Sequence, residues 1–250
     1  MKEPRHAHFQ GKEALQHVID ARLRGAMASA ETHGLEMPGH YSAAADAAKE
    51  TAFILLVLWT LFEEMSFGFE NQHLFSLVFV LGYLVWKVGR SAILGYHRLE
   101  RLHRVIEEER WEIEHHRPQE KEELSALYAA KGFSGKLLEE VIDVLMADDN
   151  RLLQVMLEEE LGLNLGTYEH PLKQAAGALI GVVGAAVIMS FGLFVLPSWG
   201  TLASAFVIIA LSAGTTAQLE KNNALSAIIW NLSIAACAAS IAYFAAQLVL

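Results

Sequence analysis

Long apolar runs separated by short polar segments dominate the second half of the chain. Residues 174–219 include no charged side chain, and a Pro- and Gly-containing cluster at 197–200 divides this run in two. A further apolar run covers 222–250, after a short polar turn. Because a helix needs about 20 mainly apolar residues to cross a bilayer, these runs predict the third, fourth and fifth spans of a membrane protein.

Two shorter apolar segments, 51–69 and 73–96, predict the first and second spans. We therefore expect an all-α fold, a five-span transmembrane helical bundle. The second span is expected to continue as one long helix to about His116, because Pro118 is the first proline that follows it.

The first predicted span contains two adjacent carboxylates, Glu63 and Glu64. Charged side chains inside a span are costly and usually face water or a partner. Adjacent helical residues point about 100° apart, so we expect one of the two to line a path through the bundle. The other is expected to pair with Lys87 or Arg90 of the second span, or to reach the outer interface.

A polar and acidic segment, 98–170, separates the second and third spans and predicts a small helical domain. Pro118 suits the first turn of one helix and Gly132 its end, while Ser134 and Asp148 suit the N-caps of the next two helices. A surface helix is also expected near the N-terminus, at 11–30. The predicted domain limits are 1–50, 51–97, 98–170 and 171–250.

Charge bias along the chain orients the predicted spans. Lys and Arg are frequent before the first span and after the second, but absent from the loops at 70–73 and 197–200. The positive-inside rule then places the N-terminus and the 98–170 domain in the cytoplasm. The first fifty residues contain no apolar signal-peptide core, which favours a bacterial inner membrane over an organelle.

The formal net charge of −10 falls mostly in the 98–170 domain. Such an acidic domain repels nucleic acid and attracts divalent cations, so we expect metal ions and the lipid bilayer as partners, and no nucleic acid. The single cysteine, Cys237, cannot form an intrachain disulfide.

The acidic residues of this domain are ordered as two E-x-x-E pairs and a later Met-x-x-x-Glu segment. Residues three or four apart share one helix face, and paired carboxylates on facing helices hold divalent metals. A thioether favours a transition metal over Mg²⁺ or Ca²⁺. The candidate metal ligands are Glu109, Glu112, Glu120, Glu123, Met156 and Glu160.

Other interpretations of these residues exist. One E-x-x-E pair alone is typical of a solvated helix face, and Met156 alone suits the apolar core of the domain. Glu112 and His115 form an E-x-x-H pattern, as in di-iron carboxylate bundles, which would suit a membrane ferroxidase; surface histidines before a helix break are the plainer interpretation.

The whole set of motifs resembles the cytosolic metal-binding domain of the vacuolar iron transporter family. In that family an E-x-x-E-x7-E-x-x-E run precedes L-Y-x-x-K-G and a closing M-M-x-E-E-L-G-L. The middle motif here covers 127–132, and the closing motif covers 156–163, with Leu157 in place of a second methionine. The resemblance implies a homodimeric, proton-coupled transporter that moves Fe²⁺ out of the cytosol. We do not expect an enzyme, and Mn²⁺ and Zn²⁺ are the alternative ions.

The first two spans depart from this family. Nothing here matches its first-span motif G-A-N-D-G-L, and the segment nearest to its second-span S-M-A-A-G-E-Y, at 91–97, lacks the Met and the Glu. In that family, these residues are associated with the translocation path. A membrane-anchored metal-binding or sensing protein without transport is therefore the alternative function, and the ferroxidase is the third.

A strip of small residues lies on the third predicted span, at Gly177, Gly181 and Ala185, with Gly184 beside it. Such strips let helices approach closely. They predict tight packing within the bundle or across a dimer, and no chemistry.

Overall fold

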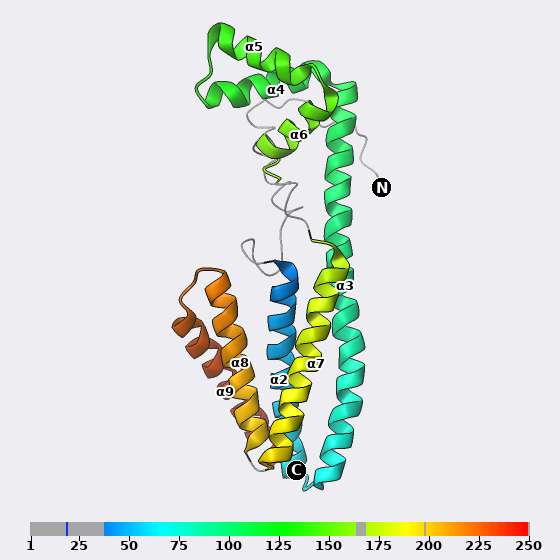
Figure 1. Cartoon of the computed structure of the whole chain (residues 1–250), viewed down its shortest axis with the longest axis vertical. Helices are drawn as coiled ribbons and strands as arrows, with labels where there is room; N and C mark the ends of the chain where they lie inside the picture. The colour runs from blue at the N-terminus through cyan, green and yellow to red at the C-terminus, as the bar shows by residue number, and fades with distance from the viewer. Residues whose placement is uncertain (1–18, 20–37, 164–168, 198, 250) are drawn as a thin grey trace. The chain divides into compact units, whose positions relative to one another are not determined.

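The computed structural model describes residues 19, 38–163, 169–197 and 199–249. The regular secondary structure of these residues is entirely α-helical (Figure 1). The helix expected at 11–30 lies almost entirely outside the described residues. The chain divides into two compact units, one containing residues 97–168 and the other 31–96 with 169–250. We call the first unit the lobe and the second the bundle.

The bundle is built around α2, which packs against three other helices of this unit, α7, α8 and α9. Its main apolar core forms where α2 meets α7 and α8, and includes Leu56, Met189 and Ile208. The helices of the bundle are α2 (Gly39–Glu64), the first part of α3 (Phe69–His115), α7 (Pro171–Val195), α8 (Gly200–Leu219) and α9 (Ala224–Val249).

Four of the described helices are long and apolar enough to cross a membrane: α3, α7, α8 and α9. They correspond to the second to fifth predicted spans. The first predicted span, 51–69, falls on α2, which ends at Glu64 and is not among the four. Charged residues stand on both sides of its apolar stretch, although its 26 residues give a length of about 39 Å.

The small-residue strip of α7 packs within the bundle, against the N-terminal half of α2. A Cβ atom at Gly177 would collide with the carbonyl oxygen of His40, and one at Gly181 with the carbonyl oxygen of Ala44. A Cβ at Gly184 would meet nothing. Glycine is thus needed at the two contact positions because backbone, which cannot move aside like a side chain, lies opposite.

We expect Gly181→Ala to destabilise the bundle by about 1–3 kcal/mol, the usual cost of forcing an extra methyl into a packed contact. The matched change Gly184→Ala should be neutral or slightly stabilising, because alanine favours helix and its methyl group enters open space. Thermal unfolding of the purified full chain in detergent measures both. Equal melting temperatures for the two variants would contradict this packing.

The lobe combines the C-terminal part of α3 with three short helices, α4 (Arg117–Ala130), α5 (Gly135–Met146) and α6 (Asp149–Glu159). The predicted punctuation is confirmed: α3 ends at His115, Pro118 lies in the first turn of α4, and Gly132 follows α4 with φ +98°. The Asp148 side chain accepts a hydrogen bond from the backbone N–H of Arg151 and caps α6.

An apolar core holds these helices together. It joins Leu102 and Ile113 of α3 to Leu124 of α4 and Ile142 of α5, and α6 and its following segment add the rest. The segment after α6 contributes Leu161 and Leu163, with Gly162 in a left-handed turn between them, at φ +65°. This turn brings the chain back over the core and fixes Glu160 beside it.

Candidate metal centre

The predicted ligands lie on separate elements of the lobe. One E-x-x-E pair lies on α3, the second lies on α4, and the Met-x-x-x-Glu segment covers the end of α6. All six side chains are buried, although five of them are carboxylates: Glu109, Glu112, Glu120, Glu123, Met156 and Glu160. Burial of so many acids is unusual, because a buried carboxylate is normally paired or bound to a metal.

Three of these carboxylates converge. Glu109, Glu120 and Glu160 each offer an oxygen atom, and these three atoms lie within 4.8 Å of one another. Glu112 and Glu123 are buried one helical turn away, and their negative charges raise the pKa of Glu109. The structure therefore brings together one acid from each of three elements, with a second acid beside two of them.

Burial and mutual repulsion make these acids hard to ionise. Desolvation raises the pKa of Glu120 to about 9, with further contributions from the charges of Glu123, Glu160 and Glu112. Desolvation likewise raises the pKa of Glu109 well above its usual range, with Glu160 the largest of its charged causes. The charged groups that shift both pKa values are all acidic, so the cluster holds an excess of negative charge.

Some carboxylate oxygens of Glu109 and Glu120 also lack hydrogen-bond donors among the described residues. Both carboxylate oxygens of Glu120 and Oε1 of Glu109 are buried without a hydrogen-bond partner in the described part of the chain. Buried polar atoms are rarely left in this state. A divalent cation would satisfy these atoms and neutralise the repulsion together, so the donor set fits a metal ion bound through oxygen.

Met156 is fully buried and belongs to the apolar core of the lobe, next to Leu152 and Leu157. Core packing is therefore sufficient to explain this methionine. Its position one helical turn before Glu160 places it on the same side of the chain as a converging carboxylate.

The histidine of the ferroxidase interpretation lies outside this buried group. His115 is exposed at the end of α3, its ring stacks on Trp111, and its Nδ1 lies 2.9 Å from the Trp111 carbonyl oxygen. The E-x-x-H pattern of Glu112 and His115 thus marks a helix end with surface histidines, the plainer of its two interpretations.

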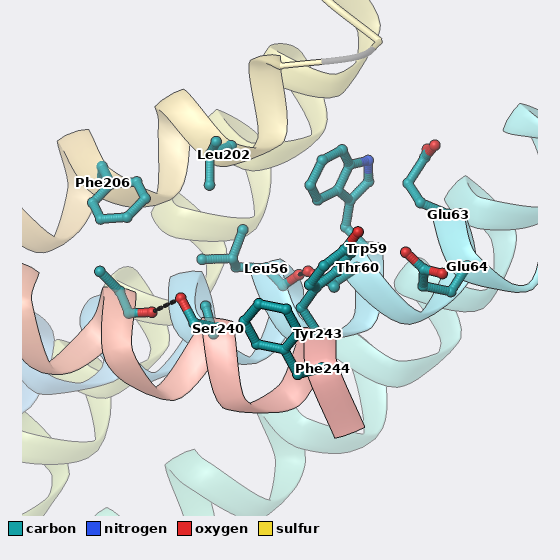
Figure 2. A pocket seen from close by; sticks show the side chains of 12 residues that line it. Leu56, Trp59, Thr60, Glu63, Glu64, Leu202, Phe206, Ser240, Tyr243 and Phe244 are labelled. Carbon is teal, nitrogen blue, oxygen red and sulfur yellow. Dashed lines mark hydrogen bonds between the residues drawn. The ribbon is translucent and has the colours of Figure 1, made fainter. Parts of the chain in front are cut away.

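A second acidic site lies in the bundle, where a cavity of about 450 Å³ opens between α2, α8 and α9 (Figure 2). Both Glu63 and Glu64 line it, whereas the sequence predicted one of them. Glu63 accepts a hydrogen bond of 3.0 Å from the Gln72 amide. Neither carboxylate pairs with Lys87, one of the two partners expected from sequence, because the Lys87 ammonium binds Glu50 instead.

The walls of this cavity are mostly apolar and aromatic. Figure 2 shows Trp59 and Tyr243 between the two carboxylates and the apolar end formed by Leu202 and Phe206. The Ser240 hydroxyl lines the same space while it donates to the Ala236 carbonyl oxygen of its own helix. The cavity thus has a charged end and an apolar end.

Comparison with models of protein families gives a match. The family model described as the VIT family matches residues 97–247, which is more than half of the chain. The matched region covers the lobe, α7, α8 and nearly all of α9, and α2 lies before it. No curated protein matches the chain.

Proposed function

Because the chain belongs to the VIT family, we propose that it moves Fe²⁺, or a related divalent transition metal, out of the cytosol across a membrane. Family membership and the apolar helices support membrane metal-ion transport as the general function. The buried, converging carboxylates of Glu109, Glu120 and Glu160 are the observation that carries the more specific proposal.

In this proposal the lobe captures the ion that is to be transported. The converging oxygens of Glu109, Glu120 and Glu160 are the primary ligands, and Glu112 and Glu123 add negative charge beside them. Fe²⁺ accepts carboxylate ligands, and a Met156 thioether would favour it over Mg²⁺ or Ca²⁺. Mn²⁺ and Zn²⁺ are the alternative ions.

The proposed membrane arrangement has five spans, with α2 as the first. Its central place among α7, α8 and α9 supports this role. The lobe and the N-terminus then lie in the cytoplasm of a bacterial inner membrane, two copies form a homodimer, and protons move in exchange for the metal ion. Glu63 and Glu64 line the part of the path that lies farthest from the cytoplasmic end of α2.

A membrane-anchored metal sensor without transport is the second candidate. The observation that favours it is the start of the family match at His97, which leaves α2 and the first part of α3 outside the matched region. Those segments would supply part of any path across the membrane.

Reconstituted vesicles that contain a metal-responsive dye separate these two functions. The full chain should give Fe²⁺ flux under reducing conditions that empty vesicles lack, and the flux should depend on a proton gradient. Metal binding by the purified chain without any flux would identify the sensor. Oxygen consumption in the presence of Fe²⁺ would instead support the ferroxidase.

We expect Glu64→Gln to lower Fe²⁺ flux in these vesicles more than Glu63→Gln does, while metal binding by the lobe stays unchanged. Glu63 already accepts a hydrogen bond from Gln72, so Glu64 is the carboxylate better placed to bind a passing ion. Glu70→Gln is the matched control, because Glu70 is an exposed glutamate in the first turn of α3. Full flux in both cavity variants would exclude these residues from the path.

A further inference from the structure

A charged side chain lies buried in the bundle away from both acidic sites. Lys87 of α3 reaches across to α2, where its ammonium lies 2.5 Å from Oε2 of Glu50. The Tyr83 hydroxyl, one turn earlier on α3, donates a hydrogen bond of 2.7 Å to the same oxygen atom. Two donors from α3 therefore meet at one carboxylate of α2.

This group lies beside the middle of the apolar run of α7. Lys173 is the last charged residue of α7 before its apolar run, and Gly181, about 12 Å farther along the helix, packs against Ala44 and Ala47 of α2. Glu50 lies one turn beyond Ala47. It is therefore roughly 15–20 Å past the level of Lys173, and on α2 it stands where the apolar stretch begins.

The two sides of the ion pair differ in their exposure. The Lys87 side chain is only 10% exposed, whereas the Glu50 side chain is 48% exposed. Both donors bind Oε2 of Glu50, and none of the described residues donates a hydrogen bond to Oε1. The buried ammonium thus holds the carboxylate from behind and leaves one oxygen atom open.

Other charges near the pair are few. On α2, Asp46 lies one turn before Glu50 and forms its own ion pair with Lys49, at 2.9 Å. On α3, Arg90 lies one turn after Lys87, and its charge acts on Tyr83. The facing part of α7 adds none, because its sequence from Gln174 to its end is uncharged.

We propose that Glu50 is a cation-binding carboxylate within the membrane, and that a divalent metal ion binds there by displacing the tethered ammonium of Lys87. The proposal rests on the transport function inferred above for the identity of the cation. When the metal ion leaves, the ammonium returns, so the carboxylate is never left as an isolated charge in an apolar layer. Charged residues at such depth are costly and commonly mark ion pathways.

Transport kinetics of the full chain in vesicles test this exchange. Glu50→Gln should lower flux by about tenfold or more, because losing one partner of a close charge pair has effects of at least that size. Lys87→Met should lower the half-saturating metal concentration and also lower the maximal rate, because the competing ammonium that assists release is gone. Lys49→Met is the matched control, since its ion pair stays within α2, and it should leave both quantities unchanged.

The double variant Glu50→Lys with Lys87→Glu separates exchange from simple packing. It keeps an ion pair between α2 and α3, so it should fold with a melting temperature close to the original, but it moves the carboxylate to the buried side. We expect little flux from it. Normal flux from this variant or from Glu50→Gln, or an unchanged half-saturating concentration for Lys87→Met, would overturn the proposal.

Equilibrium binding keeps the test independent of transport. In the full chain with Glu109→Gln and Glu120→Gln, which weaken the lobe site, residual Mn²⁺ binding in detergent should disappear with Glu50→Gln and tighten with Lys87→Met. Absence of flux from the unmodified chain would reject the transport function alone. Residual Mn²⁺ binding that ignores both changes would reject the Glu50 site alone.

Discussion

Glu120→Gln is expected to weaken metal binding by the lobe by about 100-fold or more, because loss of even an outer-shell partner of a metal ligand costs about 10–100-fold. The same change should raise the melting temperature of the metal-free chain at neutral pH. It removes a fully buried carboxyl group whose ionisation is opposed by desolvation and by the neighbouring acids. Calorimetric titration with Mn²⁺ or Fe²⁺ and thermal unfolding of the full chain measure the two effects.

The opposite signs of these effects distinguish a metal site from ordinary packing. A group that only supports the fold would lower stability when changed, with or without metal. Glu139→Gln is the matched control, because Glu139 is an exposed glutamate on α5 of the same lobe. Glu112→Gln and Glu123→Gln should weaken binding less than Glu120→Gln but more than this control. Equal effects at all these positions would indicate diffuse charge attraction and no site.

Metal binding is expected to strengthen steeply with pH between about 5 and 9, with the release of one to two protons per ion bound. The pKa of Glu120 is raised to about 9, so this acid is largely protonated at neutral pH, and burial beside other acids also raises the pKa of Glu109 well above its usual range. A metal ion binds the ionised carboxylate and must displace these protons. Affinity should therefore rise by up to about tenfold per pH unit for each proton displaced.

Stability of the metal-free chain should change in the opposite direction. Because the folded pKa of Glu120 lies above its unfolded value of about 4.5, the folded state holds more protons than the unfolded state between these two values. The free energy of unfolding then falls as pH rises through this window and levels off above it. Calorimetry in buffers of different ionisation enthalpy counts the released protons, and melting curves across the pH range follow stability. A pH-independent affinity would show that the carboxylates are already ionised.

Short-range signals in the sequence were sufficient for much of the fold. Runs of apolar residues determined the four membrane-length helices of the described chain, and Pro118 and Asp148 determined where lobe helices begin. These features depend on neighbours within a few residues, such as a missing N–H or a capping oxygen. The E-x-x-E spacing likewise placed paired acids on single helix faces without any knowledge of the fold.

Contacts between distant segments were decided only by the tertiary structure. Spacing alone does not show that Glu109 and Glu120 converge with Glu160, because that depends on how α3, α4 and the turn after α6 pack around one apolar core. The sequence offered Glu63 or Glu64 as partners for Lys87, whereas the packing of α3 on α2 places Glu50 there.

Burial is the physical reason for this division between sequence and structure. A carboxylate has much the same preference for a helix face wherever it stands in the chain. Its protonation and its affinity for a metal ion depend instead on how much water the surrounding elements exclude and on which charges they bring near. The sequence by itself therefore determined the helices and the candidate acids, and the tertiary structure determined which of those acids lose their water and share a site.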